Sequence, residues 1–113
     1  YGAHAEDSRN WAYPDCTPEF NGAMMNAVYV GTYHRLQVVT PLQWMTKAEV
    51  VAKALELQVP LEATYSCYAG GQYHCGKCST CLERIKAFKK NGRTDPVGYE
   101  VDIDWPCEKI DWR

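Results

Sequence analysis

Four cysteines within fifteen residues constrain this chain more than any other feature. Cys67 is followed after seven residues by Cys75, and two-residue gaps then lead to Cys78 and Cys81. A two-residue gap lets consecutive thiolates turn toward one centre. Four thiolates in a tetrahedral arrangement favour Zn²⁺, and a site closed by four protein ligands is structural rather than catalytic. The sequence therefore predicts a zinc-binding loop over residues 67–81.

Other interpretations of the cysteines are possible. A disulfide framework needs an oxidising compartment, and these cysteines lie too close together to join distant elements. A redox Cys-x2-Cys pair explains two cysteines rather than four. An iron–sulfur cluster also takes four thiolates, but the residues from Leu82 onward do not continue the familiar bacterial spacing. His74 is a weaker candidate ligand, since four cysteines already fill a tetrahedron. Cys16 and Cys107 are expected to stay unligated.

Size, charge and hydropathy exclude several classes of protein. A chain of 113 residues has room for one domain at most. Its net charge of −2 provides no basic field, so no direct contact with nucleic acid is expected. No apolar stretch approaches the roughly 18 residues of a membrane span. Reduced cysteines then fit a cytoplasmic protein. The first residue is Tyr1 rather than Met, and we expect the chain to be a piece of a longer protein.

Capping patterns predict three helices, over residues 17–31, 46–59 and 80–92. Thr17, Thr46 and Thr80 are the expected N-caps, and glycine or proline is expected to end each helix. Apolar residues at helical spacing should form the buried faces. These residues are Phe20, Ala23, Met24, Ala27 and Val28 in the first helix, Val50, Val51, Ala54 and Leu55 in the second, and Leu82, Ile85 and Phe88 in the third.

Two strands are predicted, over residues 1–5 and 36–40. Strands that alternate with helices indicate an α/β fold, with a parallel sheet covered by helices. Two strands are too few for a complete sheet of this kind, which again suggests a missing N-terminal half. Residues 1–92 are expected to form one α/β region that contains the zinc site. Residues 93–113 are expected to form an irregular acidic tail, which Trp105 and Trp112 could dock on the body.

Three polar residues are candidates for binding a ligand, because ligands of α/β sheets bind beyond the carboxyl ends of the strands. Asp7 and Asp15 follow the first predicted strand. Lys47 follows the second, in the first turn of a helix, where a bound anion would favour it. The alternatives are turn formation for the two aspartates and plain surface exposure for the lysine. The basic helix after Lys77 is either solvated or faces a phosphate-bearing ligand.

Three motifs carry a resemblance to a known family. They are Tyr13-Pro-Asp-Cys-Thr-Pro-Glu-Phe20, Thr40-Pro-Leu-Gln-Trp-Met-Thr-Lys-Ala-Glu49, and Thr64-Tyr-Ser-Cys-Tyr68 followed by Cys75-Gly-Lys-Cys-Ser-Thr-Cys81-Leu-Glu-Arg84. In this order and spacing they resemble the C-terminal half of the 7-cyano-7-deazaguanine synthase family, also called QueC or ExsB. The resemblance covers about residues 1–92.

The resemblance implies a Rossmann-like PP-loop ATPase fold with a four-cysteine zinc site. It implies a ligase that uses ATP, with Mg²⁺, and ammonia to convert 7-carboxy-7-deazaguanine to the nitrile 7-cyano-7-deazaguanine, a precursor in queuosine-type biosynthesis. We also expect a homodimer. This chain departs from the family in two ways. It lacks the Ser-Gly-Gly-x-Asp-Ser loop that cradles the ATP pyrophosphate, and it has Thr17 where the family commonly has arginine.

Two further functions remain open. One is another PP-loop enzyme of the same architecture that activates a different carboxylate or a tRNA base. The other is a non-catalytic zinc module that binds a partner or nucleic acid. The net negative charge and the predicted strands argue against the module. A glycine-rich phosphate loop encoded upstream of Tyr1 would favour the enzymes.

Overall fold

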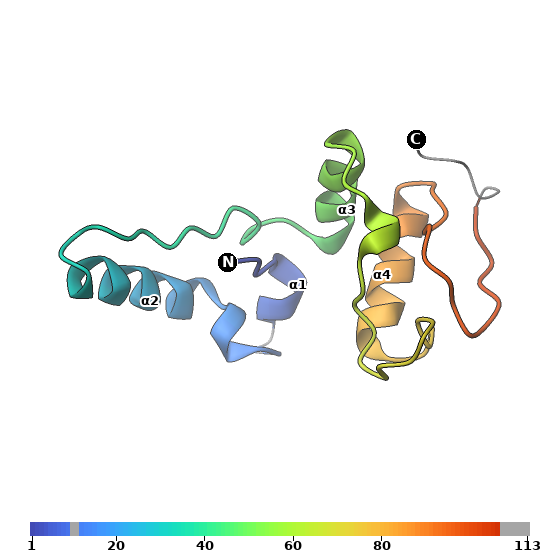
Figure 1. Cartoon of the computed structure of the whole chain (residues 1–113), viewed down its shortest axis with the longest axis horizontal. Helices are drawn as coiled ribbons and strands as arrows, with labels where there is room; N and C mark the ends of the chain where they lie inside the picture. The colour runs from blue at the N-terminus through green and yellow to red at the C-terminus, as the bar shows by residue number, and fades with distance from the viewer. Residues whose placement is uncertain (10–11, 107–113) are drawn as a thin grey trace. The chain divides into compact units, whose positions relative to one another are not determined.

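The structure is a computed structural model that describes residues 1–9 and 12–106. The chain divides into two compact units, Tyr1–Thr46 and Lys47–Arg113. Figure 1 shows the order of the elements along the chain. They are α1 (Ala5–Ser8), the 3₁₀ turn η2 (Pro14–Cys16), α2 (Pro18–Gly31), α3 (Lys47–Glu56), the 3₁₀ turn η3 (Leu61–Ala63) and α4 (Ser79–Lys90).

The first predicted helix forms as α2 in the first unit. The Thr17 side chain accepts a hydrogen bond from the Phe20 N–H at 3.2 Å, and Pro18 occupies the first helical position. Both features are the expected N-terminal signals. The predicted buried face is wrong, because Phe20, Ala23, Met24 and Ala27 are all exposed. Within this unit the helix presents a different face, which includes Met25, to the extended segment over residues 37–39.

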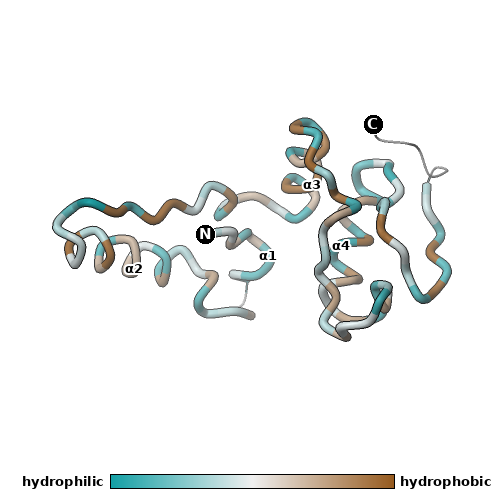
Figure 2. Tube along the Cα trace, in the orientation of Figure 1, coloured by the Kyte–Doolittle hydropathy of each residue, from teal (hydrophilic) through white to brown (hydrophobic). Residues whose placement is uncertain are grey.

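The two predicted strands do not form among the described residues. Residues 1–4 are irregular and continue into α1, while residues 35–40 are extended but have no strand partner. One hydrogen bond joins the two segments, from the Tyr1 amino group to the Val39 carbonyl at 2.8 Å. A strand exists only as part of a ladder of such bonds, so the apolar sequence of residues 36–40 is not sufficient. Figure 2 shows the apolar character of this extended segment beside α2.

In the second unit, α3 packs against α4. Helix α3 begins at Lys47, directly after the predicted cap Thr46, and ends before Pro60 as expected. Val51 of α3 lies in a buried cluster with Ala87 and Phe88 of α4. Partly buried apolar side chains surround this cluster: Ala48, Leu55, Leu61 and Trp105. The contact made by Trp105 agrees with the predicted docking of the C-terminal segment, whereas Trp112 lies outside the described residues.

Helix α4 differs from its prediction in two respects. Its N-cap is Cys78 rather than Thr80, and the Thr80 hydroxyl lies 3.2 Å from the Cys78 sulfur. The predicted inward position of Leu82 is also wrong, since its side chain is 55% exposed. Arg84 occupies the buried face instead, together with Ile85. The helix therefore starts directly after a cysteine of the metal loop, at Ser79.

The segment after α4 has no regular secondary structure over residues 93–106, yet part of it is buried. Gly92 has a φ of +65°, which is the left-handed conformation that commonly ends a helix. Thr94, Asp95 and Val97 then lie in the interior of the unit. The domain boundary predicted at residue 92 stays a prediction. Among the described residues, no helix has both the length and the apolar character needed to cross a membrane.

Candidate metal centre

The four predicted ligands lie together in the second unit. The sulfur atoms of Cys67, Cys75, Cys78 and Cys81 all lie within 4.8 Å of one another. The Cys75 and Cys81 sulfurs are 3.9 Å apart. In a tetrahedral zinc–thiolate site with Zn–S bonds of about 2.3 Å, neighbouring sulfurs are about 3.8 Å apart. The arrangement therefore suits a single metal ion held by four sulfurs, with no position left for water.

Backbone N–H groups point at two of these sulfurs. The Cys67 sulfur accepts hydrogen bonds from the N–H groups of Ala69 and Cys75, both at 3.3 Å. The Cys75 sulfur accepts from the N–H groups of Lys77 at 3.3 Å and of Cys78 at 3.2 Å. Such hydrogen bonds stabilise negative charge on sulfur, because the positive end of each N–H dipole points at it. The loop thus directs hydrogen-bond donors at two sulfurs that would carry negative charge in a metal complex.

Gly76 makes the turn between two of the ligands possible. Its φ is +73°, a conformation that side chains with a Cβ rarely adopt. A Cβ at this position would also lie 2.5 Å from the Val101 side chain. Both the backbone conformation and the close packing therefore require glycine.

Hydrogen bonds and burial move the thiol pKa values in opposite directions. The backbone N–H of Cys75 lowers the pKa of Cys67. The Thr80 hydroxyl, followed by backbone donors, lowers the pKa of Cys78 to about 5. Burial raises the pKa of Cys81 to about 12. Hydrogen bonds therefore favour the thiolate at Cys67 and Cys78, whereas burial favours the thiol at Cys81.

The donor set fits Zn²⁺, which prefers thiolate sulfur and tetrahedral geometry. His74 does not belong to it. Its Nε2 instead accepts a hydrogen bond from the Ser66 N–H at 3.2 Å. Cys16 lies in η2 of the first unit and is also outside the cluster. Cys107 lies outside the described residues.

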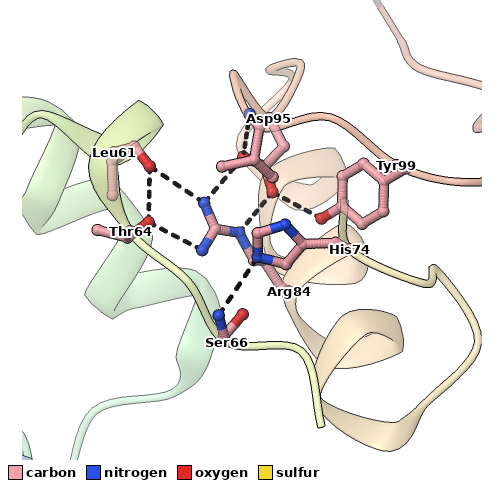
Figure 3. Close-up of polar contacts among 8 residues, drawn as sticks. Leu61, Thr64, Ser66, His74, Arg84, Asp95 and Tyr99 are labelled. Atoms are coloured by element: carbon pink, nitrogen blue, oxygen red, sulfur yellow. Dashed lines mark hydrogen bonds and ion pairs between the residues drawn. The ribbon is translucent and has the colours of Figure 1, made fainter. Parts of the chain in front are cut away.

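A buried ion pair lies beside the metal loop (Figure 3). Arg84 donates to the Asp95 carboxylate from Nε and from a terminal nitrogen, the latter at 2.9 Å. The other terminal nitrogen donates to the Thr64 hydroxyl at 2.9 Å. The two residues are only 6% and 1% exposed. The basic helix was expected to be solvated or to face a phosphate-bearing ligand, and neither describes Arg84, which binds a carboxylate of its own chain. Lys86 and Lys89 are exposed, as in a solvated helix.

Asp95 has two further hydrogen-bond donors. The Val97 N–H lies 3.1 Å from Oδ1, and the Tyr99 hydroxyl lies 2.7 Å from Oδ2. Burial and this bond to Asp95 raise the pKa of Tyr99, so the phenol keeps its proton and acts as a donor. The sequence did not predict this cluster, because Asp95 is one of several acids in the expected acidic tail and no local pattern distinguishes it from the others.

The predicted substrate-binding residues lie in different units. In the first unit, Asp7 pairs with the imidazole of His4 at 3.0 Å, and Asp15 lies exposed in η2. Lys47 is the first residue of α3 in the second unit and is partly buried. Nothing in either unit tests whether these three side chains line one ligand site, and that remains a prediction.

A second buried polar cluster was not predicted, although one of its members lies within a recognised motif. Gln43 is buried, and its amide nitrogen donates to the Cys16 carbonyl at 2.9 Å. Its amide oxygen accepts a hydrogen bond from Asn21 of α2. Gln43 therefore joins the Thr40–Glu49 motif to the segment that carries Asp15, which gives two of the three motifs a physical connection.

Comparison with known proteins gives many relatives of the same name. A 7-cyano-7-deazaguanine synthase from Caldicellulosiruptor bescii is 50% identical over 105 residues, which cover 93% of this chain and 47% of that protein. The 7-cyano-7-deazaguanine synthase of Thermoplasma acidophilum is 45% identical over 103 residues, or 88% of this chain and 42% of that protein. The chain thus spans about half the length of the curated relatives it matches. No solved structure matches it significantly.

The family comparison agrees with these relatives. Residues 1–92 match the model of a family described as "Queuosine biosynthesis protein QueC". The matched region contains all three sequence motifs and all four cysteines of the metal cluster. Because the match covers most of its length, the chain belongs to the QueC family.

Proposed function

We propose that the chain is part of an ATP-dependent carbon–nitrogen ligase that converts 7-carboxy-7-deazaguanine and ammonia to 7-cyano-7-deazaguanine. The observation that carries this proposal is the similarity to proteins named 7-cyano-7-deazaguanine synthase, at up to 50% identity over 93% of the chain. The whole protein would have a Rossmann-like PP-loop fold and work in the cytoplasm as a homodimer, in queuosine-type biosynthesis.

The chemistry explains the need for ATP. A carboxylate is a poor electrophile, so one of its oxygens would first attack a phosphorus of ATP, which breaks a phosphoanhydride bond and gives a mixed anhydride with a phosphate-type leaving group. Neutral ammonia then attacks the activated carbon and gives the amide. A second activation, this time of the amide oxygen, allows that oxygen to leave and forms the nitrile. ATP and Mg²⁺ binding are proposed for the whole protein, because the family's glycine-rich phosphate loop is not among these 113 residues.

The four-cysteine cluster has a structural role in this proposal. Zn²⁺ held by Cys67, Cys75, Cys78 and Cys81 has four protein ligands and no open position, so it does not activate water or substrate. Its ligands come from the loop before α4 and from the first turn of that helix. Metal binding therefore contributes to folding of this loop, because the loop has no apolar core of its own.

Asp7, Asp15 and Lys47 are proposed to bind the substrate. Two of them, Asp15 and Lys47, lie in motifs within the region that matches the family. A lysine in the first turn of α3 adds its charge to the positive end of the helix. Such a position suits a carboxylate or phosphate group.

The test uses the full-length gene product, supplied with 7-carboxy-7-deazaguanine, MgATP and ¹⁵N-labelled ammonia. Mass spectrometry should detect a nitrile that carries one ¹⁵N atom and should detect ATP consumption only when the substrate is present. ATP consumption with a different carboxylate or with tRNA would support another PP-loop enzyme. Absence of both activities in a correctly folded, zinc-loaded protein would refute the proposal.

A further inference from the structure

The segment that follows α4 covers the metal loop. Residues 95–103, the latch segment, approach the loop closely at two places, each marked by a glycine. A Cβ on Gly76 would lie 2.5 Å from the Val101 side chain, and a Cβ on Gly98 would lie 2.7 Å from the ring of Tyr73. One glycine belongs to the loop and the other to the latch segment. The two surfaces are therefore in van der Waals contact on both sides of Cys75.

His74 fastens the latch segment to the loop through its backbone. Its N–H donates to the Gly98 carbonyl at 3.0 Å, and its carbonyl accepts from the Glu100 N–H at 2.8 Å. These two bonds form a parallel bridge with Tyr99. The residue is 3% exposed and directly precedes Cys75. The latch segment thus holds the backbone directly before the metal ligand Cys75.

The imidazole of His74 holds the backbone next to a second metal ligand, Cys67. Nε2 accepts a hydrogen bond from the N–H of Ser66, the residue directly before Cys67. The ring packs between Tyr65 and Tyr99, with centroid distances of 4.7 Å and 5.5 Å. Residues 68–73, which connect the two ligands, are all exposed and cannot order themselves by burial. His74 therefore supplies a second connection between Cys67 and Cys75, in addition to the hydrogen bond from the Cys75 N–H to the Cys67 sulfur.

The latch segment is tied to the helix that carries the fourth ligand. Arg84 lies three residues after Cys81, about one turn further along α4, and donates two hydrogen bonds to Asp95. Asp95 also accepts a hydrogen bond from the Tyr99 hydroxyl, whose ring contacts His74. The contacts thus form a closed path from the helix through the latch segment to the loop.

We propose that the latch segment controls how fast the metal leaves the four-cysteine site, with His74 as the positioning residue. A chelator can take the ion only after a sulfur moves away from it, and that movement requires the loop to separate from the latch segment. The latch segment lies beyond residues 1–92, which match the family model. The property that it controls is metal retention rather than ligand identity.

The experiment measures the rate at which excess EDTA removes Zn²⁺ from the full-length gene product. His74→Phe keeps a buried ring but removes the acceptor for Ser66, and His74→Gln restores an acceptor near the position of Nε2. Tyr99→Phe removes the hydrogen bond to Asp95. Its matched control is Tyr73→Phe, which changes an exposed tyrosine that has no bond to Asp95. Co²⁺-loaded samples of each variant report the ligand set through their visible absorption.

Removing one hydrogen bond to a buried carboxylate should accelerate zinc release about tenfold in Tyr99→Phe. His74→Phe should show at least a similar increase, His74→Gln should return most of the way to the wild-type rate, and Tyr73→Phe should match the wild type. All variants should keep the tetrahedral four-sulfur Co²⁺ spectrum. Wild-type release rates in His74→Phe and Tyr99→Phe would overturn the proposal. A Co²⁺ spectrum altered by His74→Phe would also overturn it, because His74 would then be a ligand.

Discussion

The Arg84–Asp95 pair provides the sharpest test of the fold. Replacing Asp95 with alanine leaves the guanidinium of Arg84 buried, with only neutral acceptors on Thr64 and Leu61. The N–H of Val97 also loses its acceptor. Breaking a buried ion pair by removing one partner costs about 3–5 kcal/mol. Because Arg84 lies in the middle of α4, we expect the opening free energy of that helix to fall by this amount.

Hydrogen exchange of peptides that cover α4 measures this quantity within the full-length protein, because it reports local opening. A loss of about 3–5 kcal/mol corresponds to exchange that is about 10²–10⁴ times faster. Asp102→Ala is the matched control, since Asp102 lies in the same segment but is exposed. If exchange in Asp95→Ala were as slow as in Asp102→Ala, the buried ion pair would contribute nothing and the packing of this segment on α4 would be refuted.

A double-mutant cycle separates the pair from the cost of an unpaired charge. Arg84→Met alone should also accelerate exchange in α4, because it leaves the Asp95 carboxylate buried with fewer donors. The double variant Arg84→Met/Asp95→Ala contains neither charge, so it should be less destabilised than the sum of the two single variants. Additive effects would mean that the two side chains do not interact.

Three further predictions concern other parts of the chain. Changing any one cysteine of the metal cluster to serine should release the metal, whereas Cys16→Ser should retain it, as measured by elemental analysis; equal metal contents would refute the ligand assignment. Asp15→Ala and Lys47→Ala should each lower nitrile formation by the full-length protein about tenfold or more with an unchanged circular dichroism spectrum, since each removes a proposed contact to the substrate; normal turnover would restore the turn and surface interpretations. Thr17→Ala should cost about 1 kcal/mol by removing the N-cap of α2, and unchanged hydrogen exchange in that helix would contradict this role.

Local chemistry made the metal cluster and the starts of the helices predictable. The cysteine spacing alone identified all four members of the metal cluster, because short gaps between ligands leave the backbone few ways to arrange them. The caps at Thr17 and Thr46 located two helices to within a residue of their start. Helix α4 was also predicted, but it begins at Ser79, earlier than expected, because Cys78 rather than Thr80 is the N-cap. These signals depend only on residues close together in the sequence.

Tertiary structure decided what depends on distant partners. Residues 36–40 have the composition of a strand, but a strand needs a neighbouring backbone, and that neighbour is absent from the described residues of the first unit. Leu82 has the character of a core residue and Arg84 that of a surface residue, yet their positions are reversed. The reason is Asp95, eleven residues further along, which neutralises and binds the guanidinium in the interior. No local pattern contains that information, because a charge can be buried only when the fold brings its partner to it.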